Sequence, residues 1–382
     1  MNANLQKKGG PLTRAQALVP LVLEHADEAE RNCHLSQAVA HALADSGLMR
    51  LAAPAEFGGE EADPMTQIQT IELIAAADGS AAWNLMIGIE NFGLIAPGCG
   101  ACRHLLEDPA MIMCSSTAAI GRAERDGAGY RVSGQWQFVS GCHNAAVFCA
   151  MVRRYDEGEQ LGGNVYALTD LFEIVENWNV SGMRGSGSHD VHLDNVWVPD
   201  NQIVAPLGQV ASDSPLVRFP LGARLAYNKV AISFGLARAA LDHFVELAEG
   251  KIPRFTSRSL RERPTAQIAI AESEVRLRAS RALVFELVEA MWDRVVAGDD
   301  ITLKDRAMFH IACSDAARGA VEVVDRVADA AGTTANFKSH PLERISRDVR
   351  VVRQHLTVAG HHIEDGGRVL LGLDPKGAML NS

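Results

Sequence analysis

The sequence predicts a mainly α-helical chain with a β domain between two helical regions. Apolar residues recur with helical spacing from about residue 12 to 110, and again from about 216 to 370. Between these regions, from about 112 to 205, apolar and polar residues alternate. Single hydrophobic cores stop growing at about 250–300 residues, so a chain of 382 residues favours several domains. The expected domains are an N-terminal helical domain, a β domain and a C-terminal bundle, over 1–111, 112–212 and 213–382.

The N-terminal region is typical of short helices rich in alanine and leucine. The first apolar stripe comprises Leu18, Leu21, Leu23 and Ala26. Two further helices are expected over 65–77 and 81–90, because the intervening Asp-Gly-Ser at 78–80 favours a turn that caps the second helix.

The middle region changes to a period of two residues. The residues Tyr130, Val132, Gly134, Trp136 and Phe138 alternate with polar neighbours, which predicts a half-buried strand. The strands of this region do not alternate with long helices, so a parallel doubly wound sheet is disfavoured. We expect a small antiparallel barrel or sandwich.

The C-terminal region contains four long helical patterns with short connections. Each pattern is about 25–30 residues long, well above the usual mean of about 11–12. Long helices joined by short connections predict a four-helix bundle. The helices are expected over 223–249, 265–297, 302–331 and 341–370.

Charge and hydropathy exclude two classes of partner. The chain has 36 Lys and Arg against 47 Asp and Glu, a formal net charge of −11, which opposes a nucleic-acid surface. Residues 1–14 lack an apolar export signal, and the longest uncharged stretch, 132–152, contains Ser, Gln, Asn, His and Gly. We therefore expect a cytoplasmic protein that binds neither nucleic acid nor membrane.

Several common catalytic motifs are missing from the sequence. The glycines at 182, 185 and 187 follow a polar stretch and precede a strand, which is the wrong context for a dinucleotide-binding loop. The adjacent His361 and His362 cannot face one way on a helix, and no other cluster has ligand spacing, so no metal site is expected.

Five short motifs follow one another along nearly the whole chain. They read PAEFGG at 54–59, CSST at 114–117, YRVSGQWQFVSG at 130–141, WNVSGMRGSGS at 178–188, and PLERISRD with a later QH at 341–355. Together they resemble the acyl-CoA dehydrogenase superfamily. The resemblance implies a helical domain, an antiparallel β barrel or sandwich and a four-helix bundle, with a flavin between the last two and a homotetrameric assembly.

This superfamily holds two chemistries, and the sequence distinguishes them. A dehydrogenase needs a carboxylate base, but the usual place for it falls on His355 and Leu356. The other place is on the first bundle helix, where residues 223–243 offer only Asp242 near the end of the stretch. Glu364 and Asp365 are interpreted as a solvated face. The motifs at 78–83, 138–141 and 354–355 instead resemble the two-component flavin-dependent monooxygenases of this fold, which include aromatic hydroxylases and the dibenzothiophene oxidase type.

That resemblance implies a cofactor, a co-substrate and a partner. The cofactor is reduced flavin, FMN or FAD, supplied by a separate NAD(P)H-dependent flavin reductase, and molecular oxygen is the co-substrate. Oxygen reacts to a flavin 4a-hydroperoxide, which survives only where water is excluded. The implied substrate is an aromatic or heteroaromatic small molecule.

The resemblance also assigns roles to individual residues. Ser140 is the hydrogen-bond partner of the flavin N5 edge, and His355 is a general base or an orienting group at the substrate. Asn91 takes the place of a substrate-binding histidine found in related phenol hydroxylases, which argues against a simple phenol and leaves an indole-like or polycyclic substrate open. The other expected flavin contacts are Trp136, Phe138 and Gly141 at the ring, Ser115 and Thr117 at the phosphate, and Arg254, Ser257 and Gln267 at the flavin of a neighbouring subunit.

Two alternatives stay open at the level of sequence. The first is an acyl-CoA dehydrogenase with a displaced catalytic base. The second is a catalytically silent flavin-fold protein that serves as a binding module, against which Ser140 and His355 both argue.

Overall fold

The computed structural model describes residues 9–207 and 214–381, which form two compact units. The first unit comprises Met1–Asp63, Trp83–Val180 and Arg184–Arg218. The second comprises Pro64–Ala82, Ser181–Met183 and Phe219–Ser382. This division differs from the three consecutive domains expected from the sequence, whose boundaries stay predictions.

The helices of the first unit pack small apolar side chains. They are α2 (Pro11–Asn32), α3 (Gln37–Asp45), α6 (Pro215–Arg218) and the part of α5 (Gly79–Leu94) from Trp83 onward. The Ser36 side chain caps α3 by accepting a hydrogen bond from the Val39 N–H. The first apolar stripe of the sequence is wrong at Leu23, which is exposed, because α2 buries Ala15, Val22, Ala26 and Ala29 instead.

The strands form one seven-stranded sheet in the order β5-β6-β2-β1-β3-β4-β7. Their bounds are β1 Met113–Asp126, β2 Gly129–Trp136, β3 Val147–Asp156, β4 Glu159–Thr169, β5 Glu173–Val175, β6 Asp190–Pro199 and β7 Ile203–Val204. The sheet is mixed and not purely antiparallel, because β1 pairs antiparallel with β2 and parallel with β3. After β2 the chain crosses to the other side of β1, which is what a parallel pair requires.

The predicted alternation along β2 holds as far as Trp136 and then ends. Trp136 is fully buried in the core of the sheet, packs edge-on against Phe148 and donates its indole N–H to the Met151 carbonyl at 3.0 Å. Phe138 has a left-handed backbone (φ 59°) and is 68% exposed, so it is not the next core residue of the strand.

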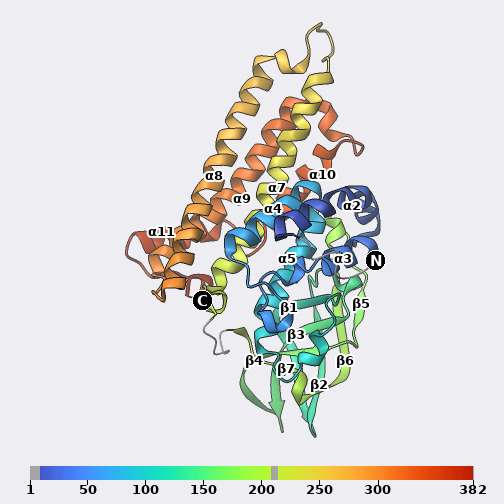
Figure 1. The fold of residues 1–382 in the computed structure, drawn as a ribbon, viewed down its shortest axis with the longest axis vertical. Coiled ribbons are helices and arrows are strands. Elements are labelled where there is room, and N and C mark those ends of the chain that lie inside the picture. Colours follow the sequence, from blue (N-terminus) through green and yellow to red (C-terminus); the bar gives the residue numbers. More distant parts are fainter. Residues whose placement is uncertain (1–8, 208–213, 382) are drawn as a thin grey trace. The chain divides into compact units, whose positions relative to one another are not determined.

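The second unit is a helical bundle. Figure 1 shows its long helices α7, α8 and α9 running side by side. Thr302 caps α9 through a reciprocal capping box with Asp305, and Gly298 ends α8 with a left-handed residue. The helices are α4 (Pro64–Ala77), α7 (Leu221–Gly250), α8 (Pro264–Ala297), α9 (Leu303–Ala331), α10 (Pro341–Arg353) and α11 (His361–Leu370). Short 3₁₀ turns are η1 (Leu48–Arg50), η2 (Ala55–Phe57), η3 (Ala96–Gly98), η4 (Arg103–Leu106), η5 (Cys142–Asn144), η6 (Arg184–Ser186), η7 (Asp200–Gln202), η9 (Leu260–Glu262), η10 (Gly332–Asn336) and η11 (Ala378–Asn381).

The helix expected over 341–370 is two helices, α10 and α11, separated by residues 354–360. Side chains satisfy the backbone groups of this break. The Ser314 hydroxyl of α9 lies 3.1 and 2.9 Å from the carbonyls of Val358 and Ala359, and the His355 ring accepts from the Thr357 N–H. Bonds of this kind compete with helical bonds, which periodicity alone does not reveal.

A buried histidine of α9 makes the bundle sensitive to acid. His310 is 1% exposed and its ring stacks on that of His362. Burial first, and then the charge of His362, lowers the pKa of His310 from 6.5 to about 3. The folded protein therefore holds this ring neutral, while the unfolded chain protonates it below about pH 6.5.

Replacing His310 with leucine is expected to reduce the loss of stability in acid. The wild-type protein should lose about 2–3 kcal/mol through this group between pH 7 and pH 4.5, and H310L should not. Urea unfolding at both pH values measures the difference, and the exposed His104→Leu serves as the control. An equal loss in H310L and wild type would contradict the assignment.

Candidate functional site

Ser140 lies in a segment that leaves β2 and runs beside residues 186–189. The Val139 N–H donates to the His189 carbonyl at 2.9 Å, and the Gly141 N–H donates to the Ser186 carbonyl at 3.0 Å. Ser140 itself is 5% exposed. These backbone bonds hold its hydroxyl in one place.

The Ser140 hydroxyl has two partners from distant parts of the sequence. The indole N–H of Trp83 in α5 donates to Ser140 Oγ at 3.0 Å. Ser188 Oγ lies 2.7 Å from Ser140 Oγ and also 2.7 Å from Ser186 Oγ. The sequence motifs contained Trp83, Ser186 and Ser188, but sequence reasoning gave none of them a role.

Gly141 and Phe138 shape the two sides of Ser140. Gly141 has φ 76°, and a Cβ there would lie 2.6 Å from Asn84 Oδ1, so the turn requires glycine. The exposed Phe138 ring meets Trp178 edge-on, with 6.1 Å between the ring centres. An accessible aromatic surface two residues from a fixed hydroxyl suits a planar heteroaromatic ring with hydrogen-bonding edges, so these residues fit a flavin.

Trp136 does not share this position. Because its side chain is fully buried among the strands and its indole N–H is bonded to Met151, it has no surface to offer a flavin. The expectation that Trp136 lines the flavin is corrected, since the strand directs this side chain into the core of the sheet.

The structure brings two other predicted residues together, Asn91 of α5 and Ser115 of β1. Ser115 Oγ donates to Asn91 Oδ1 at 2.6 Å, and Asn91 Nδ2 donates to the Met113 carbonyl at 2.8 Å. Asn91 is 3% exposed, so these contacts favour a structural link between α5 and β1 over a substrate contact. Thr117 is exposed where the β1–β3 pairing is interrupted between Ser116 and Gly121.

His355 lies directly after α10 and holds its ring neutral. Burial first, and then the charge of Lys229, lowers its pKa from 6.5 to about 3, which is below the near-neutral value expected of a general base. Nδ1 lies 3.0 Å from Thr357 Oγ1 and accepts from the Thr357 N–H at 3.4 Å. A backbone N–H only donates, so the neutral ring carries its proton on Nε2. This tautomer favours the orienting role over that of a base.

Two of the sequence motifs meet in the second unit. The backbone N–H of Met183, in the 178–188 motif, donates to Asp348 Oδ1 at 2.6 Å. Asp348 is 2% exposed, and its neighbour Arg347 pairs with Glu343 at 2.8 Å. The Arg-Asp pair therefore anchors residues 181–183 to α10.

Arg254, Ser257 and Gln267 are exposed residues at the junction of α7 and α8. Gln267 lies in the first turns of α8 and donates to the Arg261 carbonyl at 3.2 Å. Their expected contact with the flavin of a neighbouring subunit stays a prediction.

The carboxylates available to a dehydrogenase are engaged elsewhere. Asp242 is exposed and lies 3.5 Å from Arg238, and Glu364 pairs with Lys376 at 2.6 Å. The sequence suggested that Asp365 lies on a solvated face, and this is wrong. It is 5% exposed, because its carboxylate accepts the backbone N–H groups of Lys376 and Gly377 at 2.9 Å.

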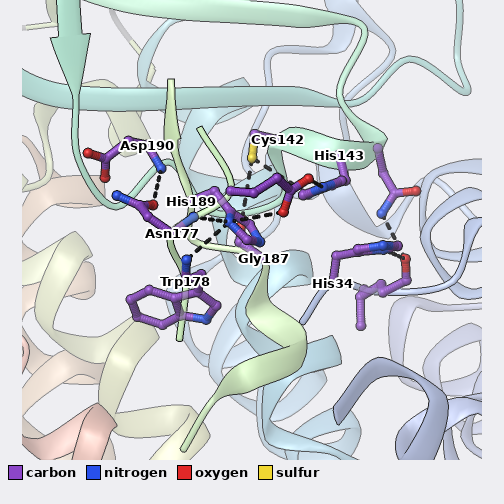
Figure 2. Close-up of polar contacts among 11 residues, drawn as sticks. His34, Cys142, His143, Asn177, Trp178, Gly187, His189 and Asp190 are labelled. Atoms are coloured by element: carbon purple, nitrogen blue, oxygen red, sulfur yellow. Dashed lines mark hydrogen bonds and ion pairs between the residues drawn. The ribbon is translucent and has the colours of Figure 1, made fainter. Parts of the chain in front are cut away.

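Three residues distant in sequence have the spacing of metal ligands: His143, Glu176 and His189. Figure 2 shows this part of the first unit. His143 Nε2 lies 2.7 Å from Glu176 Oε1, which lowers the pKa of Glu176. His189 Nδ1 accepts the N–H groups of Asn177 and Trp178 at 3.0 and 3.1 Å, so its lone pair is committed to the backbone. The cluster therefore acts as a hydrogen-bonded anchor, and the expectation of no metal site stays a prediction.

In residues 9–207 and 214–381 we find no helix with both the length and the apolar character needed to cross a membrane.

Comparison with known proteins agrees with this geometry. Models of the N-terminal and C-terminal domains of acyl-CoA dehydrogenase match residues 15–96 and 228–359. An indole-3-acetate monooxygenase of Pseudomonas putida is 29% identical, over 91% of this chain and 90% of that protein. The oxygenase subunit HsaA, a flavin-dependent monooxygenase of Rhodococcus jostii, is 28% identical, over 90% of this chain and 93% of its own.

Among solved structures, a 3-HSA hydroxylase from Rhodococcus sp. RHA1 superimposes with a TM-score of 0.86 at 25% identity, covering 98% of this chain and 100% of that one. The fold and the relatives make the protein an oxygenase component that uses reduced flavin and molecular oxygen and depends on a separate flavin reductase. The chain therefore belongs to the acyl-CoA dehydrogenase superfamily and, within it, to the two-component flavin-dependent monooxygenases.

Proposed function

We propose that this monooxygenase hydroxylates a bicyclic or polycyclic heteroaromatic molecule, with Ser140 at the flavin and His355 at the substrate. One observation carries the proposal: the Ser140 hydroxyl is buried, makes two hydrogen bonds and lies two residues from the exposed Phe138 ring. One relative is named an indole-3-acetate monooxygenase, and this supports a substrate that contains a nitrogen heterocycle. The engaged side chain of Asn91 supports it too, because no proton acceptor for a simple phenol stands at that position.

Each residue has a task that its own geometry allows. Bound reduced flavin supplies two electrons to oxygen, of which one atom enters the substrate and the other leaves as water. Ser140 holds the N5 edge of the flavin ring. His355 donates a hydrogen bond from Nε2 to an oxygen atom of the reactants and so orients it. Ser115 and Thr117, on β1, are proposed for the flavin phosphate.

The proposed setting is a homotetramer in the cytoplasm. All seven cysteines are free, as is usual in a reducing compartment. The α7–α8 junction exposes Ile252 and Phe255 beside Arg254 and Ser257, and exposed apolar side chains of this kind suit a subunit contact. Gln267, in the first turns of α8, is exposed near the same junction, and all three polar residues are proposed to contact the flavin of the neighbouring subunit.

The proposal is tested by turnover with ¹⁸O₂ and chemically reduced FMN or FAD. Indole-3-acetate and p-hydroxyphenylacetate serve as two substrate types, with hydrogen peroxide measured in parallel. We expect one ¹⁸O atom in the indole product and less peroxide when that substrate is present. Hydroxylation of the phenol alone would contradict the proposed substrate class. Anaerobic reduction of bound oxidised flavin by an acyl-CoA would instead support the dehydrogenase alternative, and failure to bind flavin would support the binding module.

A further inference from the structure

The Ser140 hydroxyl ends a row of three buried serine hydroxyls. Ser186, Ser188 and Ser140 are 1%, 5% and 5% exposed, and 2.7 Å separates each successive pair of oxygens. Ser188 has a single proton, so it can donate to only one of its two neighbours. When its proton is bonded within the row, the row points either from Ser186 to Ser140 or from Ser140 to Ser186. In the remaining arrangement both neighbours donate to Ser188, and the Ser188 proton has no acceptor in the row.

Trp83 makes these two directions unequal. An indole N–H only donates, so it fills one of the two lone pairs of Ser140 Oγ. If the row points toward Ser140, the Ser188 proton fills the second lone pair, and Ser140 has only its own proton to offer a ligand. If the row points away, Ser140 offers a lone pair and the proton of Ser186 needs an acceptor.

The far end of the row decides which ligand suits it. Within residues 9–207 and 214–381, the Ser186 hydroxyl has the Ser188 hydroxyl as its only hydrogen-bond partner. A ligand that donates to Ser140 therefore leaves one buried proton, that of Ser186 or that of Ser188, unpaired, with the desolvation cost that this carries. A ligand that accepts from Ser140 leaves every proton of the row bonded.

The backbone around the row holds it in place. Gly187 lies between Ser186 and Ser188 in the chain, and its carbonyl accepts from the Cys142 thiol at 3.5 Å; Figure 2 shows Gly187 and Cys142 facing each other. On the other side, Asn177 Oδ1 accepts the Asp190 N–H at 3.0 Å, while the His189 ring accepts from the 177–178 backbone. The oxygens of Ser186 and Ser188 are therefore set by a fixed loop.

We propose that Trp83, Ser188 and Ser186 are positioning residues that make Ser140 a dedicated hydrogen-bond donor, so that the site favours a flavin whose N5 accepts a hydrogen bond, as the oxidised flavin left after turnover does. The inference rests on the proposed function, which places Ser140 at the flavin N5. It adds that the polarity of this contact is fixed by residues that do not themselves touch the flavin.

The test compares FAD with 5-deaza-FAD, in which a C–H replaces N5 and cannot accept a hydrogen bond. The dissociation constants of the oxidised forms are measured by titration calorimetry, and the FMN pair is treated in the same way. Wild type should bind FAD about fivefold more tightly than the deaza analogue, as one hydrogen bond allows. S140A should bind both equally. W83F and S188A should each reduce the ratio to about twofold, and the double variant should reduce it to about one.

Two control variants separate polarity from packing. S188T keeps the hydroxyl and should keep the fivefold ratio. Ser46→Ala removes another buried hydroxyl of the first unit, one that donates to the Leu43 carbonyl, and should also leave the ratio unchanged. A loss of stability alone weakens both ligands together and does not move the ratio.

The outcomes distinguish this inference from the proposed function. If S140A keeps the wild-type ratio, Ser140 does not face N5, and the placement under the proposed function fails. If S140A abolishes the ratio while W83F, S188A and their combination keep it, Ser140 contacts N5 but its polarity is not set by the row, and only the present inference is overturned.

Discussion

Replacing His355 with alanine is expected to abolish product formation while reduced flavin is still oxidised. The neutral ring offers an Nε2–H that alanine cannot replace, and loss of one such positioned group costs roughly 100-fold or more in rate. Oxygen should then return as hydrogen peroxide in place of product. The measurement is the ratio of product to reduced flavin consumed, with peroxide determined in the same reaction.

The exposed His361→Ala provides a matched control, because it removes a histidine from the adjacent helix α11. H355Q retains an N–H donor and should recover part of the coupling. Since the pKa of His355 lies at about 3, the wild-type product yield should not follow a histidine titration between pH 6 and 8. Full coupling in H355A would remove His355 from the mechanism.

The order of the helical, β and helical regions could be predicted because the periodicity of the sequence changes twice. The family resemblance, and not the periodicity, places Leu356 where a dehydrogenase carboxylate would be; its side chain is 63% exposed in the structure. Side-chain periodicity reports which face of an element is buried, and it carries that information well over long helices.

Periodicity was insufficient where local hydrogen bonds redirect the chain. The alternation along β2 would place Phe138 on the same face as Trp136, but the left-handed backbone at Phe138 turns that ring outward. Likewise, the apolar pattern over 341–370 continues through the break at 354–360, which depends on the Ser314 hydroxyl of another helix.

The candidate site was predicted only where one short motif contains it. Ser140 and Gly141 are neighbours, and the motif at 138–141 names both. The partners of Ser140 are Trp83 and Ser188, 57 and 48 residues away, and Met183 meets Asp348 across 165 residues. Contacts of such separation are set by the folded topology, which a single sequence does not display.

The crossing of α4 and α7 gives the second large expected effect. A Cβ added at Gly235 of α7 would lie 2.5 Å from Ala75 Cβ and 2.9 Å from the Ala76 backbone nitrogen of α4. Neither atom belongs to a flexible side chain, so the two helices have to separate. Overpacking of this kind costs about 1–3 kcal/mol, more than the helix propensity gained when alanine replaces glycine.

We therefore expect Gly235→Ala to lower the unfolding midpoint of the protein in urea and by heat. Its matched control is Gly250→Ala at the end of the same helix, where an added Cβ meets nothing within 4 Å and stability should stay within about 0.5 kcal/mol of wild type.

The displacement of α7 in G235A should also lower the product yield. The Leu225 carbonyl of α7 lies 3.3 Å from the Thr357 hydroxyl, which in turn approaches His355 Nδ1. A displaced α7 should therefore lower the product yield of G235A below that of G250A at a temperature where both are folded. Equal midpoints and equal yields for the two variants would show that the bundle absorbs the added methyl group without moving α7.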